Sequence, residues 1–269
     1  MEVTMKLLLF LVMLFSVISL AINFASECIA MVDDNIVLWF KFDEGSGTIA
    51  KDSSIYKNDG TIKGAKWVDG KNGSALSFDG INNIVEVPST DNLQLSDQGL
   101  TIAVWFKTTE TARQDLMFIE KGAWDVGEYA LSYPGYANFR VRFQINEICG
   151  QQTCQIDSTS GVPGLSDNKW HHTAGVYDAV KHTFKVYVDG KLETEQGAAA
   201  HKFTPDNQSV FVGSRNNQGL YYFGVIDDLL VAKVPFTDDQ VKKHMDGVLF
   251  DVSPAGRLTT EWGKIKKMD

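Results

Sequence analysis

Short apolar runs alternate with clusters of Gly, Asp, Asn and Ser through most of this 269-residue chain. The runs are rich in β-branched and aromatic residues, which is typical of strands, and the clusters supply the residues that tight turns need. We expect strands at residues 36–42, 66–68, 75–78, 84–87, 100–107, 116–120, 128–132, 139–144, 170–177, 183–188, 209–212 and 226–232. Many short strands with turn signals between them predict an all-β fold, a two-sheet antiparallel β-sandwich or jelly roll.

Helix is scarce in the sequence. Thr237 followed by Asp238 and Asp239 is typical of a helix N-cap with acidic residues in the first turn, so we expect a short helix that runs to Met245. Asp189 and Gly190 separate two strand-like runs and predict a tight hairpin turn.

The N-terminus has the pattern of an export signal. Lys6 precedes the almost wholly apolar residues 7–24, and small residues lead up to Ala30, which favours cleavage after that position. An uncleaved membrane anchor is the alternative, because the apolar run is long for a signal core. A lipid anchor on Cys28 ranks third, since Glu27 is a poor neighbour for it. The sequence therefore predicts a secreted or surface-displayed protein.

Removal of residues 1–30 leaves a single domain at 31–250 and a C-terminal extension at 251–269. It also leaves an even pair of cysteines, Cys149 and Cys154, separated by a short polar loop. An exported chain favours a disulfide between them, and two free thiols in a hairpin are the alternative.

The formal net charge of the chain is −9. A surface of that sign repels phosphate backbones, and no basic run with interleaved aromatic residues occurs, so nucleic acid is an unfavourable partner.

Seven motifs in order resemble the laminin G-like, concanavalin A-like jelly-roll family. The motifs are WFKFDEGSG at 39–47, DSS at 52–54 with NDG at 58–60, ALSFDG at 75–80, LTIAVWFK at 100–107, WHH at 170–172, VDG at 188–190 and GVIDD at 224–228. The resemblance runs from about residue 36 to about residue 245. It implies two face-to-face antiparallel sheets, recognition of sugars, glycans or proteins, and in many members one structural calcium ion.

The resemblance implies a set of calcium ligands in the turns. They are the side chains of Asp43, Asn58, Asp227 and Asp228 and the carbonyl group of Gly60. Calcium prefers carboxylate, amide and carbonyl oxygens, and the first and last strands of a jelly roll can be neighbours, which would bring these groups together. The alternative is that they cap turns and pair with surface lysines.

Loop residues with flat rings and hydrogen-bonding side chains are the candidate ligand-binding groups. They are Trp124, Tyr133, Tyr136, Arg215, Asn217 and Tyr221. Sugar faces stack on aromatic rings, and loops commonly carry binding residues. The alternatives are aromatic rings folded back over the edge of the sandwich and an ordinary polar turn at residues 215–218.

The sequence shows no recognisable catalytic motif. A Glu-x-Asp-x-Glu strand, a His-Glu-x-x-His pair, a Gly-x-Ser-x-Gly elbow and a phosphate-binding glycine loop are all absent. We therefore expect a non-catalytic binding module for carbohydrate or for a glycosylated or protein partner. A glycan hydrolase of the same fold and a structural surface module are the alternatives.

Overall fold

A computed structural model describes residues 34–94, 97–112, 116–122, 129–146, 154–161, 163–198, 205–215 and 219–249, without the side chains of Tyr136 and Cys154. The predicted export signal, the extension at 251–269 and Cys149 lie outside these residues, so the disulfide stays a prediction. None of the described helices is both long and apolar enough to cross a membrane.

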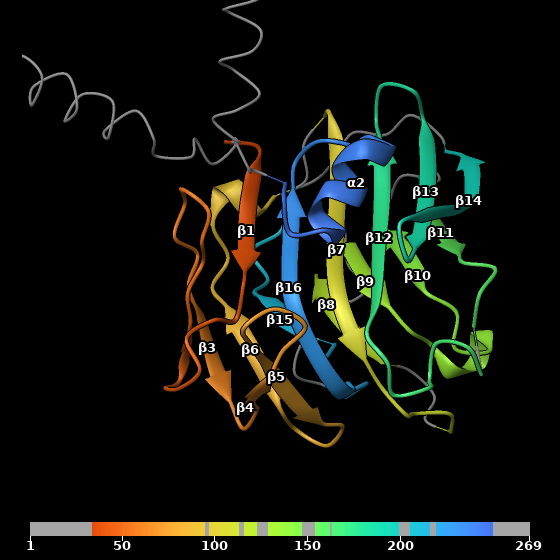
Figure 1. Ribbon diagram of the computed structural model, residues 1–269. Coiled ribbons are helices and arrows are strands. Elements are labelled where there is room, and N and C mark those ends of the chain that lie inside the picture. The colour runs from red at the N-terminus through yellow and green to blue at the C-terminus, as the bar shows by residue number, and fades with distance from the viewer. Residues whose placement is uncertain are drawn as a thin grey trace, which may run out of the picture. The chain divides into compact units, whose positions relative to one another are not determined.

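One eight-stranded antiparallel sheet, sheet A, contains most of the long strands (Figure 1). Its order is β14 (Lys191–Gly197), β13 (Thr183–Val188), β12 (His171–Asp178), β7 (Gly99–Lys107), β16 (Phe223–Ala232), β5 (Ser74–Asp79) and β4 (Lys66–Asp69), and β1 (Ile36–Phe40) also pairs with β16.

A second eight-stranded antiparallel sheet, sheet B, forms the other layer. Its order is β11 (Cys154–Asp157), β10 (Arg142–Ile145), β9 (Tyr129–Ser132), β8 (Met117–Lys121), β15 (Val210–Val212), β6 (Ile84–Val87), β3 (Gly60–Lys63) and β2 (Ile49–Ala50). Two short 3-10 helices, η1 (Asp91–Leu93) and η2 (Gly135–Ala137), lie in the connections.

Strand β16 changes partners along its length. Residues 223–226 pair with β5, whereas residues 229–232 pair with β1 on the same edge, and β7 lies along the opposite edge. The first and last strands are therefore neighbours, as we expected. Asp227 and Asp228 lie at the junction between the two pairings, where the register with β7 also shifts.

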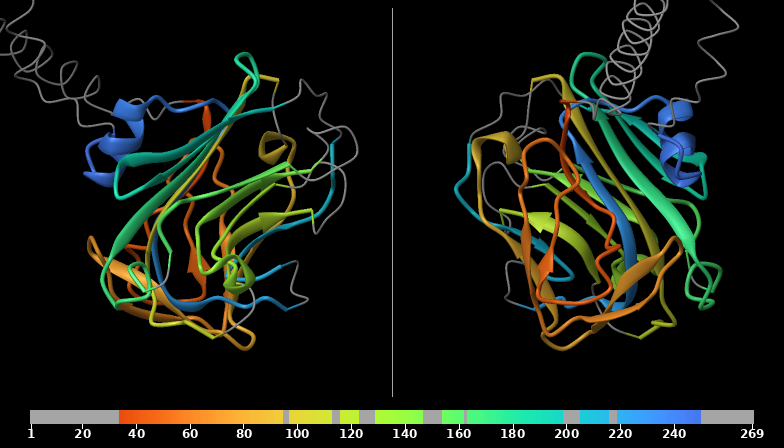
Figure 2. Two further views of the ribbon diagram at one scale, coloured as in Figure 1. Left: turned by 90° about the vertical axis from the view of Figure 1, so that its right-hand side faces the viewer. Right: turned by 60° about the vertical axis from the view of Figure 1, so that its left-hand side comes forward.

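The hydrophobic core lies between the sheets. Alternate residues of facing strands fill it, with Phe106, Phe118, Tyr133 and Phe143 among the larger side chains. Close packing leaves no room for a side chain at Gly175, because a Cβ there would lie 2.3 Å from Cγ of Phe143. Figure 2 shows the two layers and α2 (Asp238–Met245) on the outer side of sheet A.

The predicted helix is confirmed, with a complete capping box at its start. The Thr237 side chain accepts a hydrogen bond from the backbone N–H of Gln240, and the Gln240 side chain accepts one from the backbone N–H of Thr237. The all-β sandwich is confirmed as well, and each of the twelve predicted strand segments overlaps an observed strand. The twelve predicted segments do not include β2, β3 and β11, which are short strands near the free edges of sheet B, or β14, which is an edge strand of sheet A.

Candidate functional site

A β-bulge in β16 turns two neighbouring carboxylates away from the core. Ile226 and Leu229 face the core on either side of the bulge, and Asp228 adopts a left-handed backbone with φ of 46°. Aspartate and asparagine adopt this conformation more readily than most residues. Bulges occur often beside functional sites, where they redirect side chains.

Asp227 is completely buried and held by the backbone. Its Oδ2 accepts hydrogen bonds from the N–H groups of Lys71 at 2.8 Å and Asn72 at 3.1 Å, and its Oδ1 accepts one from Asp228 at 2.8 Å. Burial raises the pKa of Asp227 to about 7, and the nearby charge of Asp228 adds to that rise, although the three backbone bonds oppose it. Asp227 thus fixes the turn between β4 and β5 against β16.

Asp228 has one carboxylate oxygen that accepts no hydrogen bond from the described residues. Its side chain is 10% exposed, and its Oδ1 accepts a 2.6 Å hydrogen bond from Nε1 of Trp39. Its Oδ2 has no hydrogen-bond partner among the described residues. This oxygen is an open acceptor, to which a ligand or solvent can donate a hydrogen bond.

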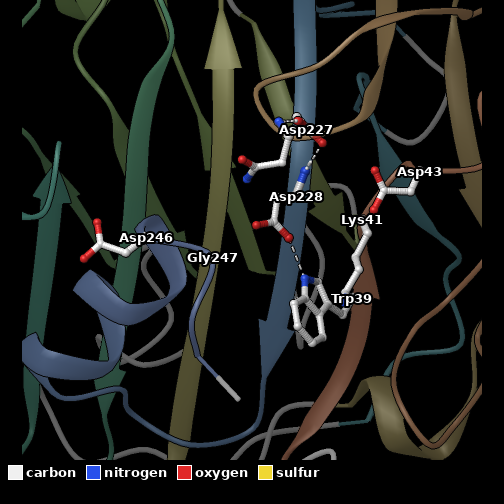
Figure 3. Close-up of a pocket in the computed structure, with 8 residues that line it drawn as sticks. Trp39, Lys41, Asp43, Asp227, Asp228, Asp246 and Gly247 are labelled. Carbon is white, nitrogen blue, oxygen red and sulfur yellow. Dashed lines mark hydrogen bonds between the residues drawn. The ribbon is translucent and has the colours of Figure 1, made fainter. Parts of the chain in front are cut away.

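The exposed part of Asp228 faces a pocket of about 250 Å³ (Figure 3). The lining residues are Trp39, Lys41, Asp43, Asn72, Asp227, Asp228, Asp246 and Gly247. Figure 3 shows Lys41 and Asp43 on the side of β1, and Asp246 and Gly247 on the side of α2. We call this the Asp228 pocket.

The turn at Gly73 allows Asp43 to approach the pocket wall. Gly73 has φ of 60°, and a Cβ at this position would lie 2.1 Å from Oδ1 of Asp43, so a larger residue would displace the Asp43 carboxylate and strain the backbone. On the same side of the pocket, the Lys41 ammonium group lies 4.3 Å from the centre of the Trp39 ring. Lys41 forms no ion pair with the carboxylates around it in the described part of the chain.

A buried histidine pair lies behind the pocket, between sheet A and α2. His172 Nε2 and His244 Nδ1 are 3.0 Å apart, and His244 Nε2 lies 3.9 Å from Oδ1 of Asp228. The outward ring nitrogens, His172 Nδ1 and His244 Nε2, have no hydrogen-bond partner in the described residues. Burial lowers the pKa of both imidazoles, so both stay neutral near neutral pH.

The structure brings three of the five predicted calcium ligands to this pocket, Asp43, Asp227 and Asp228. Asn58 lies elsewhere, where its amide donates to Val37 and Asn92. Gly60 lies in β3 of sheet B, packed against side chains of the core.

These residues do not fit a calcium cage in this arrangement. Across the described residues, no group of three or more Asp, Glu, His or Cys side chains lies close enough to hold a metal ion. Both oxygens of Asp227 are already bonded to backbone N–H groups. Calcium binding stays a prediction.

The predicted ligand-binding loop residues do not form one described site. Tyr133 is completely buried, with its ring 5.6 Å from that of Phe106, so it packs in the core and is not a surface platform. Arg215 forms an ion pair with Glu120 at 2.8 Å, and Tyr221 is half-buried. Trp124, Asn217 and the side chain of Tyr136 lie outside the described residues.

Five residues of the pocket were not predicted from the sequence: Trp39, Lys41, Asn72, Asp246 and Gly247. Trp39 lies in an apolar strand-like run, a pattern that favours core packing for its side chain. The pairing of β1 with the bulged part of β16 instead places its indole N–H at Asp228. Polar residues flank β1 at both ends. They were the signal available in the sequence that β16, the partner of β1, changes its pairing nearby.

The architecture and the sequence agree with one family. Residues 79–242 match the family model described as the concanavalin A-like lectin/glucanases superfamily, which is more than half of the chain. The chain belongs to the concanavalin A-like lectin/glucanase superfamily. A comparison with curated protein sequences gives no match.

Solved structures similar to this superfamily member are mainly binding domains. The binding domain of Paraclostridial Mosquitocidal Protein 1 is 14% identical with a TM-score of 0.62, covering 79% of this chain and 52% of that one. The binding domain of botulinum neurotoxin DC, in complex with rat synaptotagmin II, is 11% identical with a TM-score of 0.60, covering 81% and 52%. This chain therefore spans about half the length of those toxin domains.

A third similar structure is matched over nearly its whole length. Domain 4 of AbnA, a GH43 extracellular arabinanase from Geobacillus stearothermophilus, in complex with arabinotriose, is 22% identical with a TM-score of 0.59, covering 78% of this chain and 98% of that one. At these identities the likeness establishes the shared fold.

Proposed function

We propose that the protein is a non-catalytic carbohydrate-binding module and that the Asp228 pocket holds one sugar residue. The observation that carries this proposal is Oδ2 of Asp228, which accepts no hydrogen bond from the described residues and belongs to a pocket-lining side chain that is only 10% exposed. A sugar hydroxyl supplies the missing donor. Export to the outside of the cell, predicted from the leader, belongs to the same proposal.

The other lining groups suit a polyol. Asp43 and Asp246 offer further acceptors, while the Lys41 ammonium and the Asn72 amide offer donors. Trp39 contributes an aromatic wall, and its ring is fixed by the bond to Asp228. A rigid pocket with a few polar groups and one aromatic wall is typical of sites that orient a small ligand.

The similar structures support a binding role for this fold. The AbnA domain was solved with arabinotriose and the neurotoxin DC domain with synaptotagmin II. The AbnA domain favours a carbohydrate ligand for this chain. The neurotoxin domain makes a protein partner the alternative class of ligand. The hydrogen-bonding groups that line a small pocket favour the sugar.

A hydrolase is the second candidate, and one observation bears on it. Glu86 and Glu120 lie opposite Phe211 on neighbouring strands, so both carboxylates project from the outer face of sheet B. Glu86 pairs with Lys63, and Glu120 pairs with Arg215. Each carboxylate is thus engaged by a cationic side chain of the protein, which does not suit the pair of carboxyl groups facing the substrate that glycoside cleavage needs.

A glycan array tests the proposal. We expect the parent protein to bind a restricted set of glycans, and Asp228→Asn to lose that binding, because an amide nitrogen then stands where an acceptor oxygen is needed. Asp97→Asn, an exposed aspartate that does not line the pocket, makes the same change in charge and should bind as the parent does. Binding retained by Asp228→Asn, or no glycan bound at all, would refute the pocket as the site.

Reducing-sugar release from the glycans identified on the array tests the hydrolase. We expect none. Release by the parent that is abolished in Glu120→Gln would overturn the non-catalytic assignment.

A further inference from the structure

We propose that the Asp228 pocket selects an amino sugar, a hexose unit that carries a free, protonated amine. This inference rests on the proposed function, since it names the class of sugar that the same pocket takes. Three properties of the pocket support it: its negative charge, the spacing of its carboxylates and the open acceptor oxygen of Asp228.

The charge of the pocket is negative. Leaving aside Asp227, whose oxygens are already bonded, the lining has three carboxylates, Asp43, Asp228 and Asp246, against one ammonium group, that of Lys41. None of these carboxylates forms an ion pair with a lysine or arginine in the described residues. An ammonium group on the ligand therefore gains charge-assisted hydrogen bonds, which are roughly twice as strong as those of a neutral hydroxyl.

The carboxylates are spread around the cavity. They do not come close enough together to form a metal-binding group. A bare ion can contact only groups that converge on one point, whereas a polyatomic cation distributes its donors over several ångströms. The cavity of about 250 Å³ has room for roughly eight water molecules at about 30 Å³ each, which is suitable for one sugar residue.

Asp228 gives the pocket its geometric specificity. Its side chain is fixed by the bulge and by the 2.6 Å bond from Trp39, so the open oxygen has one orientation. The Trp39 ring already holds an ammonium group, because Lys41 lies over it. An alkylammonium group is therefore stable beside the Trp39 ring. A ligand amine that binds there competes with the Lys41 ammonium group for the same ring.

Isothermal titration with three probes tests the inference: glucosamine oligomers, their N-acetylated counterparts and a lysine-rich peptide, at a pH well below the pKa of the sugar amine. Acetylation removes the charge while it keeps the sugar ring. We expect the parent protein to bind the free-amine oligomer at least about tenfold more tightly than the acetylated one. Added salt should reduce that preference.

Two variants with opposite expectations make the test specific. Asp228→Asn should abolish the preference for the free amine, and Asn is compatible with the left-handed backbone at this position, so the fold should persist. Lys41→Gln should increase the affinity for the free-amine oligomer, because it removes the competing positive charge. Asp97→Asn should match the parent, and thermal melting of each variant checks folding.

The contrary outcomes are distinguishable. Equal affinity for both oligomers would overturn the amine preference while the proposed function stands. No binding of any sugar would overturn the proposed function and this inference with it. Tighter binding of the lysine peptide would assign the pocket to a basic protein segment, and calcium that displaces the sugar from the parent but not from Asp228→Asn would assign it to a metal.

Discussion

At the scale of single residues, the site depends on which side chains the bulge in β16 leaves with hydrogen-bonding capacity. Asp227 and Asp228 are adjacent in sequence but differ in role, because three backbone N–H groups hold the first and one indole N–H holds the second. The sequence identified both residues as candidates. It could not separate them, since the donors come from the β4–β5 turn and from β1.

The histidine pair predicts an acid-sensitive stability. His172 and His244 have lowered pKa values in the folded state, so below about pH 6.5 the unfolded chain takes up two protons that the fold does not. Each histidine then lowers the free energy of unfolding by up to about 1.4 kcal/mol for each pH unit. The protein therefore becomes less stable as the pH falls from about 6.5 toward the lowered pKa values.

His244→Gln removes one of these two protonation sites. We expect the free energy of unfolding, measured by urea denaturation at a series of pH values, to depend less steeply on pH in the variant than in the parent. His171, whose pKa is raised by its hydrogen bond to Asp189, contributes in the opposite direction in both proteins and cancels in the comparison. Equal slopes would show that the pair is not neutral in the fold.

At the scale of elements, the pattern of residues within a segment was sufficient to predict most of the strands. The run in β7 is almost wholly apolar because both faces of the strand are buried. By contrast, β3 alternates buried and exposed over only four residues, Gly60–Lys63, and β2 has two residues. Such short strands depend on pairing with a neighbour, and that information lies outside the segment itself.

The capping box of α2 is an element whose contribution can be measured. Thr237→Ala removes the acceptor for the N–H of Gln240 and should lower the free energy of unfolding by about 1 kcal/mol. Thr237→Ser keeps a hydroxyl and should retain most of the stability. Urea denaturation of the three proteins checks this, and an alanine variant as stable as the parent would contradict the role of the cap.

At the scale of the whole molecule, the fold depends on the packing of sheet A against sheet B. Gly175 of β12 and Phe143 of β10 meet across the core, and no single segment of sequence records that contact. Gly175→Ala should destabilise the protein by about 1–3 kcal/mol through overpacking. Adding Phe143→Leu should recover part of the loss, which a double-mutant cycle measures; strictly additive effects would contradict the contact.

Calcium also acts on the whole molecule, because an ion that binds only the folded state raises the melting temperature. The sequence predicts such a rise. The dispersed positions of Asn58, Gly60 and the pocket carboxylates instead predict equal melting temperatures in calcium and in EDTA. A calcium-dependent rise that disappears in Asp43→Asn would reinstate the calcium site.

The central claim is that a sugar is recognised where β1 and β16 meet. The most direct measurement is the NMR signal of the Trp39 indole N–H, which donates to Asp228 inside the pocket. We predict that this resonance shifts in a saturable manner as the bound glycan is added, in step with the binding isotherm. Saturable glycan binding that leaves the Trp39 indole resonance unmoved would contradict the account.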